Sequence, residues 1–149
     1  MEPEPRRWKG AEAWIFLSIA DAGGTEQTTL DKVIGGADSN NHAIPNVDEF
    51  SLAVGQLVGA GLVVAAPNRY ALTDSGRRLF EEINSMRLGH ITRFVETAKA
   101  WKLRAPSDAD PVQWQVDADL FNRAYETYHE WFEATYKRLR ESDEGNRKP

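Results

Sequence analysis

The sequence predicts a mainly α-helical protein with a small β-hairpin, followed by two long C-terminal helices. Three observations carry this prediction. Apolar residues recur at helical spacing over most of the 149 residues. The runs Leu62–Ala66 and Arg69–Leu72 flank the turn pair Pro67-Asn68, a pattern typical of two short strands joined tightly. A hydrophobic content of 41% with five Trp residues is enough to build a core.

Two helices are expected before residue 40. The first spans Trp8–Ala22, where apolar residues are too dense for a one-sided stripe, so we expect it to be the central helix. Gly23-Gly24 ends it. The second helix is short, begins at a cap supplied by Thr28 or Thr29, and extends through Ala37. Its inward residues are expected to be Leu30, Val33 and Ile34.

A third helix follows the polar turn Asp38–Pro45. Asn46 is its expected N-cap, it extends from about Val47 to Ala60, and Gly61 ends it as a left-handed C-cap. Stepping 100° per residue around this helix separates a core side centred on Val54 from an outer side. The outer side is expected to carry Asp48, Glu49, Leu52, Gln56 and Gly59.

A long helix is expected after the hairpin. Thr73 or Asp74 caps it, and its apolar residues keep a helical period from Ser75 to Arg104, with Gly89 as a place where it can kink. This helix carries seven Lys or Arg and three Glu, which form a solvated face or contact phosphates. Its inward residues are expected to be Leu79, Phe80, Ile83, Met86, Ile91, Phe94, Val95, Ala98 and Trp101.

The last helix begins at Asp117 or Asp119, after the connector Ala105–Pro111, and extends to about Glu141. One of its faces is a wide aromatic stripe, which packs on the long helix, packs on a second subunit or lines a ligand pocket. The chain has too little other mass to cover both long helices, so we expect a homodimer through residues 75–140. The interface residues are expected to include Phe94, Trp101, Phe121, Tyr125, Tyr128, Trp131 and Phe132.

These elements divide the chain into four parts. Residues 1–8 form a disordered N-terminus, residues 9–80 the domain with the hairpin, residues 75–141 a helical dimerisation arm, and residues 142–149 a disordered tail.

The hairpin and its flanks carry a family resemblance. Gly61-Leu62-Val63, followed by Tyr-x-Leu-Thr-x-x-Gly-x-x-Leu over residues 70–79, resembles the wing and following helix of winged helix-turn-helix regulators of the MarR and PadR kinds. The resemblance covers residues 11–80. It implies a dimeric DNA-binding transcription regulator whose third helix lies in the major groove. Two departures are the long turn before the third helix and a short wing with Arg69 as its only base.

The charge distribution disagrees with DNA reading by the third helix. Residues 1–75 hold five Lys or Arg against ten Asp or Glu, whereas residues 76–149 hold thirteen of each. No Lys or Arg occurs from Val33 to Asn68. Proteins that bind duplex DNA gain much of their affinity from Lys and Arg side chains that neutralise phosphates, whereas carboxylates repel the phosphates.

Candidate DNA-contacting residues nevertheless exist at the expected positions. The alternative is that each serves only the fold or the solvent, with Asn46 as a helix cap, Asn68 as a turn residue and Gln56 solvated. The candidates are Asn46, Gln56, Asn68, Arg69, Arg77 and Arg78.

Enzyme chemistry and cofactors are not expected. The chain has no Cys, which excludes disulfides and thiolate zinc sites. His42, His90 and His129 lack metal-ligand spacing, so no metal is expected either. No apolar run approaches a membrane span and the N-terminus lacks a signal-peptide core, so we expect a cytoplasmic protein that does not contact membranes.

Two functions remain open. The first is a dimeric winged-helix regulator that binds double-stranded DNA. The second is a winged-helix interaction module that binds a partner protein through its acidic third helix and its aromatic last helix. Salt dependence separates them, because affinity for DNA falls steeply with salt.

Overall fold

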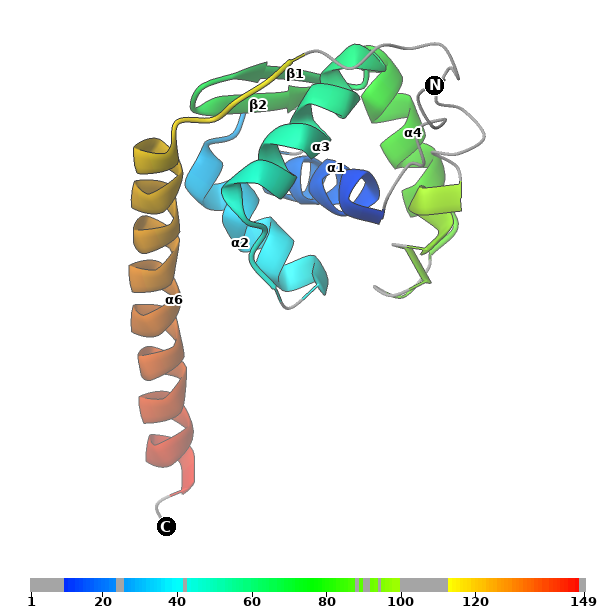
Figure 1. Cartoon of the computed structure of the whole chain (residues 1–149). Helices are drawn as coiled ribbons and strands as arrows, with labels where there is room; N and C mark the ends of the chain where they lie inside the picture. The colour runs from blue at the N-terminus through cyan, green and yellow to red at the C-terminus, as the bar shows by residue number, and fades with distance from the viewer. Residues whose placement is uncertain are drawn as a thin grey trace.

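The protein is mainly helical, with one two-stranded antiparallel sheet. The computed structural model describes residues 10–23, 26–41, 43–87, 89, 92–93, 95–99 and 113–147. In Figure 1, helices pack around α1, the hairpin lies at one end of the body, and α6 stands beside the body and extends past it. The elements are α1 (Gly10–Gly23), α2 (Leu30–Asn41), α3 (Val47–Gly59), β1 (Val63–Ala66), β2 (Arg69–Leu72), α4 (Asp74–Ser85) and α6 (Ala118–Arg147).

Helix α1 is the centre of the core, as its dense apolar sequence predicts. Every residue from Ala13 to Ala20 is buried, and α1 packs against α2 and α3. The indole Nε1 of Trp14 donates a buried 2.8 Å hydrogen bond to the carbonyl of Ala37, which satisfies the polar atom of an otherwise apolar side chain.

Helix α2 extends four residues beyond Ala37, the end that the sequence predicts. Gly35 and Gly36 lie within this helix and do not end it. Gly36 allows α2 to pack closely on α1, because a Cβ there would lie 2.8 Å from the carbonyl oxygen of Ser18. The longer α2 leaves only residues 42–46 between α2 and α3. Its inward residues are confirmed as buried, namely Leu30, Val33 and Ile34.

The start of α2 is fastened to the hairpin. The side-chain Oδ1 of Asn68 accepts a 3.0 Å hydrogen bond from the amide of Leu30 and so replaces the threonine cap expected from sequence. Thr28 forms a bridge with Tyr70, through amide-to-carbonyl bonds of 2.8 and 2.9 Å. The sequence gives no sign of this third piece of β pairing, because a single paired residue shows no alternating pattern.

The predicted caps of α3 and α4 are confirmed. Asn46 accepts from the amide of Glu49 at 2.7 Å, and Gly61 follows α3 with a φ of +74°. Thr73 accepts from the amide of Gly76 at 3.1 Å. Gly76 lies against the hairpin, because a Cβ there would lie 2.1 Å from the carbonyl oxygen of Leu62.

The prediction of one helix from Ser75 to Arg104 is wrong. Helix α4 ends at Ser85, Arg87 has a φ of +52°, and helical structure reappears at residues 92–93 and 95–99. Bonds of the i to i+3 type tighten the last turn, from the amide of Met86 to the carbonyl of Ile83 and from Arg87 to Asn84. Of the expected inward residues, Leu79 and Ile83 are buried, Phe80 and Ala98 half-buried, Met86 and Val95 exposed, while Ile91, Phe94 and Trp101 lie outside the described residues.

Helix α6 begins where predicted and continues past Glu141 to Arg147. Asp117 starts it, accepting from the amide of Asp119 at 2.9 Å. The continuation follows from the good helix formers around residue 140, since no helix breaker occurs before Gly145. No helix in the described part of the chain is both long and apolar enough to cross a membrane.

Candidate interaction site

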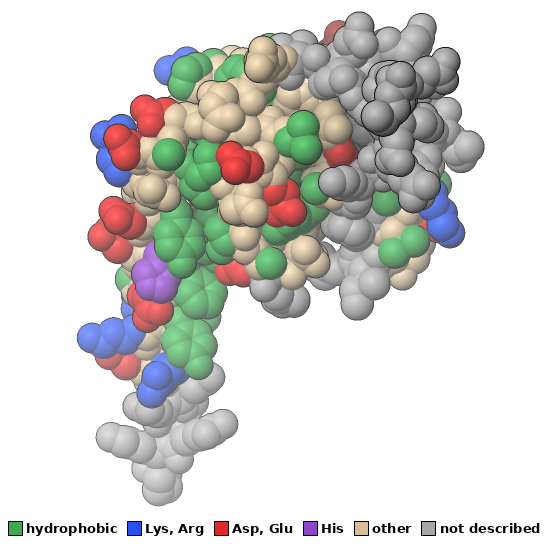
Figure 2. Space-filling model, in the orientation of Figure 1, with side chains coloured by type: hydrophobic (Ala, Val, Ile, Leu, Met, Phe, Trp, Pro, Cys, Tyr) green, Lys and Arg blue, Asp and Glu red, His purple; other side chains and the backbone are tan. Residues whose placement is uncertain are grey.

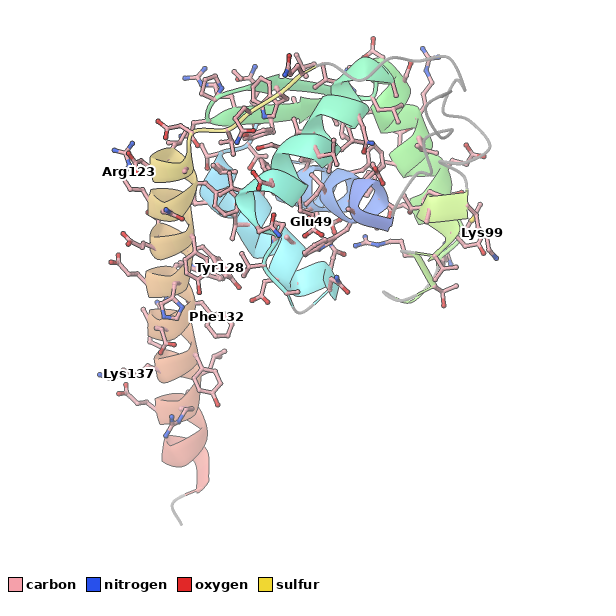
Figure 3. The ribbon with its side chains drawn as sticks, viewed as in Figure 1. Glu49, Lys99, Arg123, Tyr128, Phe132 and Lys137 are labelled. Atoms are coloured by element: carbon pink, nitrogen blue, oxygen red, sulfur yellow. The ribbon has the colours of Figure 1, made fainter. Side chains whose placement is uncertain are left out.

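The outer face of α3 is narrow and acidic. Asp48, Glu49 and Leu52 are exposed, and the side chain of Leu52 is 54% accessible. Glu49 is labelled in Figure 3. Because the sequence has no Lys or Arg from Val33 to Asn68, this face offers carboxylates and no base to a ligand.

A second side of α3 is covered by the chain that leads into α6. The amide of Val116 donates to Oγ of Ser51 at 3.2 Å, and the ring of Phe121 lies 5.7 Å from the ring of Phe50. The expectation that Gln56 is exposed is wrong, because it is 8% accessible. The helical projection assumed one covered side, whereas α3 is covered on more than one.

The six predicted DNA-contacting residues do not share one role. Asn46 and Asn68 cap helices, Gln56 is buried, and Arg77 forms an ion pair with Asp74 of its own helix. The remaining two are exposed, Arg69 at the hairpin turn and Arg78 on α4.

Among the described residues, several exposed large apolar side chains gather on the part of α6 that extends past the body. We call Trp131, Phe132, Tyr136 and Leu139 the aromatic strip. Trp131 is 59% and Leu139 61% accessible. The rings of Phe132 and Tyr136 are stacked with centroids 6.2 Å apart. Figure 2 shows hydrophobic side chains on the side of α6 turned toward the body and charged ones along the opposite edge.

A groove of about 880 Å³ runs between this face of α6 and the body, and we call it the α2–α6 groove. It is open, and the aromatic strip together with Thr127, Tyr128 and Thr135 forms one wall. The opposite wall consists of Asp21 and Ala22 at the end of α1 and of Asp31, Lys32, Gly35, Gly36, Asp38 and Ser39 of α2.

Tyr128 joins the two walls at the base of the groove. Its hydroxyl donates a 2.5 Å hydrogen bond to the Asp38 carboxylate. Burial, followed by this hydrogen bond, raises the pKa of Tyr128 well above its usual value, so the hydroxyl stays protonated and able to donate into the alkaline range. Gly35 makes room for the ring, because a Cβ there would lie 3.0 Å from a ring carbon of Tyr128.

A polar cluster supports the α2 wall from behind. The Arg93 guanidinium donates to both carboxylate oxygens of Asp21, at 3.1 and 2.6 Å, and to Oδ1 of Asn40 at 2.7 Å. Asn40 in turn donates to Asp21 and to the carbonyl of Gly36. In the sequence, Arg93 is one of the seven Lys or Arg of the predicted long helix, which were expected to form a solvated face or to contact phosphates. Since the partners are 53 and 72 residues away, local patterns gave no signal for the cluster.

The predicted dimer residues separate into three groups. Phe94 and Trp101 lie outside the described residues. Phe121 is only 4% accessible, so its assignment to an intermolecular surface is wrong, because the chain folds back and packs it on α3. The others remain on the accessible side of α6, with Tyr128 half-buried and Tyr125, Trp131 and Phe132 exposed.

Within the described residues, no group of three or more His, Asp or Glu is arranged to hold a metal ion. His129 is exposed and lies 3.8 Å from a carboxylate oxygen of Glu133 one turn later, while His42 and His90 lie outside the described residues. Comparison of the chain with protein-family models, with curated proteins and with solved structures found no match.

Proposed function

We propose that this chain is a winged-helix protein–protein interaction module that binds its partner in the α2–α6 groove. The observation that carries the proposal is the aromatic strip, which is exposed along one wall of the groove. Burying one large apolar side chain contributes about 1.5–3 kcal/mol, so a contiguous exposed set of four favours a partner that covers it.

The order of elements supports the winged-helix part of the proposal. Three helices precede a hairpin and a fourth helix follows it, and the Thr28 bridge ties the chain before α2 to β2. The connection from Asn41 to Val47 is also shorter than the sequence predicts, which removes one of the two departures from the winged-helix pattern.

The properties of α3 support protein binding over DNA binding. An α3 inserted in the major groove would present Asp48 and Glu49 near phosphates. Part of the same helix is occupied by residues 113–121 of the chain itself. DNA binding would therefore depend on Lys and Arg side chains outside α3, of which Arg69 and Arg78 are exposed.

The first test is a salt titration with random duplex DNA, read by fluorescence anisotropy. We expect no binding at about 50 mM salt for the wild type or for Arg69→Ala. A steep loss of affinity with salt, reduced by Arg69→Ala and Arg78→Ala, would overturn the proposal in favour of DNA binding, because each phosphate contact adds about one unit to the slope.

The second test is a photocrosslinking amino acid placed at Phe132. We expect it to crosslink to protein, while the same group at Lys137 does not, because Phe132 points toward the groove and Lys137 away from the body in Figure 3. Crosslinking that is equal at the two positions, or absent at both, would count against the groove as the binding site.

A further inference from the structure

We propose that the occupant of the α2–α6 groove is a second copy of this chain, whose α6 enters the groove antiparallel to the first. This inference rests on the proposed function and specifies its partner. An exposed apolar wall needs an apolar surface of similar shape, and the aromatic strip itself is such a surface, on a helix that extends free of the body (Figure 1).

The position of the strip supports mutual burial. Its residues run from Trp131 to Leu139, so the centre is Thr135, a half-buried groove residue. Two antiparallel α6 helices that cross at Thr135 place Trp131 of each copy opposite Leu139 of the other. The same arrangement carries residues 136–142 of each α6 into the groove of the other copy, as far as its base at Tyr128. Each strip is then buried against two surfaces of the other copy, its aromatic strip and its α2.

The charges of α6 select the antiparallel direction. Residues 126–133 hold three Glu and no Lys or Arg, whereas residues 137–144, which an antiparallel pair crossing at Thr135 places opposite them, hold three Lys or Arg and three Asp or Glu. An antiparallel pair therefore sets the acidic turns of one copy beside a segment without net charge in the other. A parallel pair sets like charges together, which opposes association.

The rim of the groove adds to this preference. A helical projection places Arg138 and Arg140 on the two flanks of the strip, and both are exposed. The α2 wall carries Asp31 and Asp38 against Lys32, while Asp21 is already paired with Arg93. In the antiparallel arrangement the two arginines of one copy approach the aspartates of the other; in the parallel one they approach each other.

The experiment uses single cysteines in the full chain, which has no native Cys. Thr135→Cys lies at the crossing, and we expect it to form an intermolecular disulfide under mild oxidation. Ser142→Cys should not, because 14 residues of helix separate its two copies by about 21 Å along the antiparallel axis. Crosslinking at both positions would indicate a parallel pair and overturn the proposal.

Sedimentation velocity measures the association itself. We expect the wild type to be dimeric at micromolar concentration and Phe132→Glu to raise Kd by about 30-fold or more. Arg138→Glu should weaken the dimer more than Lys137→Glu, its matched control on the outward side of α6. Glu133 lies on the same flank of the strip as Arg140, so reversing both charges in one chain should restore the association that is lost when only one of them is reversed.

These experiments distinguish failure of the self-association from failure of the proposed function. A wild type that is monomeric at about 100 μM, or a dimer insensitive to Phe132→Glu, would overturn the self-association. If the photocrosslinker at Phe132 then captures a different protein, the proposed interaction module stands and only its partner changes. A steep salt dependence with duplex DNA would instead remove the proposed function, whatever the oligomeric state.

Discussion

At the scale of single residues, Gly76 shows how little space separates α4 from the hairpin. The nearest obstacle to a Cβ is the carbonyl oxygen of Leu62, a backbone atom that cannot turn aside as a side chain can. Thr73 adds to this tight junction by donating to the carbonyl of Gly61 at 2.6 Å while it caps α4. The sequence predicted the threonine cap at this junction, because a cap is a local signal.

We therefore expect Gly76→Ala to lower the free energy of unfolding by at least about 2 kcal/mol, because the hairpin must shift away from α4. Gly89→Ala is the matched control, since nothing lies within 4 Å of a Cβ there, and should change stability by no more than about 0.5 kcal/mol. Urea denaturation measures both. Equal effects of the two substitutions would show that the contact with Leu62 relaxes freely.

At the scale of elements, the predictable features are those set by residues that lie close together in the sequence. The starts of α3, α4 and α6 were predicted because Asn46, Thr73 and Asp117 act on amides within three residues. The end of α4 and the packing of residues 113–121 on α3 were missed. The second depends on contacts between distant parts of the chain, of which the Val116–Ser51 bond is an example, and the Arg93 cluster, also missed, is of the same kind.

The Arg93 cluster gives a prediction for the segment that follows α4. We expect Arg93→Ala to lower the free energy of unfolding by about 1–2 kcal/mol, because it removes charge-assisted hydrogen bonds to a partly buried carboxylate. Amide hydrogen exchange at residues 95–99 should accelerate. Lys99→Ala is the control, since its pair with Glu96 is exposed and contributes at most about 0.5 kcal/mol. Unchanged exchange in Arg93→Ala would show that other contacts hold this segment.

At the scale of the whole molecule, the sequence predicts which residues form the aromatic face of α6, but it does not predict where on the molecule that face is exposed. The aromatic face of α6 follows from its spacing in the sequence. Which part of that face the body covers does not, because Phe121 is buried, Tyr128 half-buried and Trp131 exposed along one continuous stripe. The division is made by the positions of α3 beside Phe121 and of α2 beside Tyr128, which no local pattern encodes.

Alkaline pH tests this packing through two tyrosines. Burial raises the pKa of Tyr70 above its usual value, and burial with the Asp38 contact does so for Tyr128. A raised folded-state pKa stabilises the fold fully below the unfolded pKa of about 10, and this contribution is lost as pH rises through the folded pKa.

Stability measured by urea denaturation should therefore decline between about pH 10 and 12 in the wild type. We expect a shallower decline in Tyr128→Phe, which keeps only the contribution of Tyr70. Tyr136→Phe, whose ring is exposed, should follow the wild type. The same slope in all three proteins would contradict the burial of Tyr128 between α2 and α6.

The attachment of α2 at its two ends has a consequence for motion. At one end it is joined to the hairpin through Asn68 and through the Thr28 bridge, and at the other to the Asp21–Asn40–Arg93 cluster. An element anchored at both ends cannot swing about either. Any widening or narrowing of the groove must then come from α6, which below Tyr128 has no such anchor among the described residues. If the groove changes width, Tyr128 is therefore the expected pivot of α6, with α2 as the fixed wall.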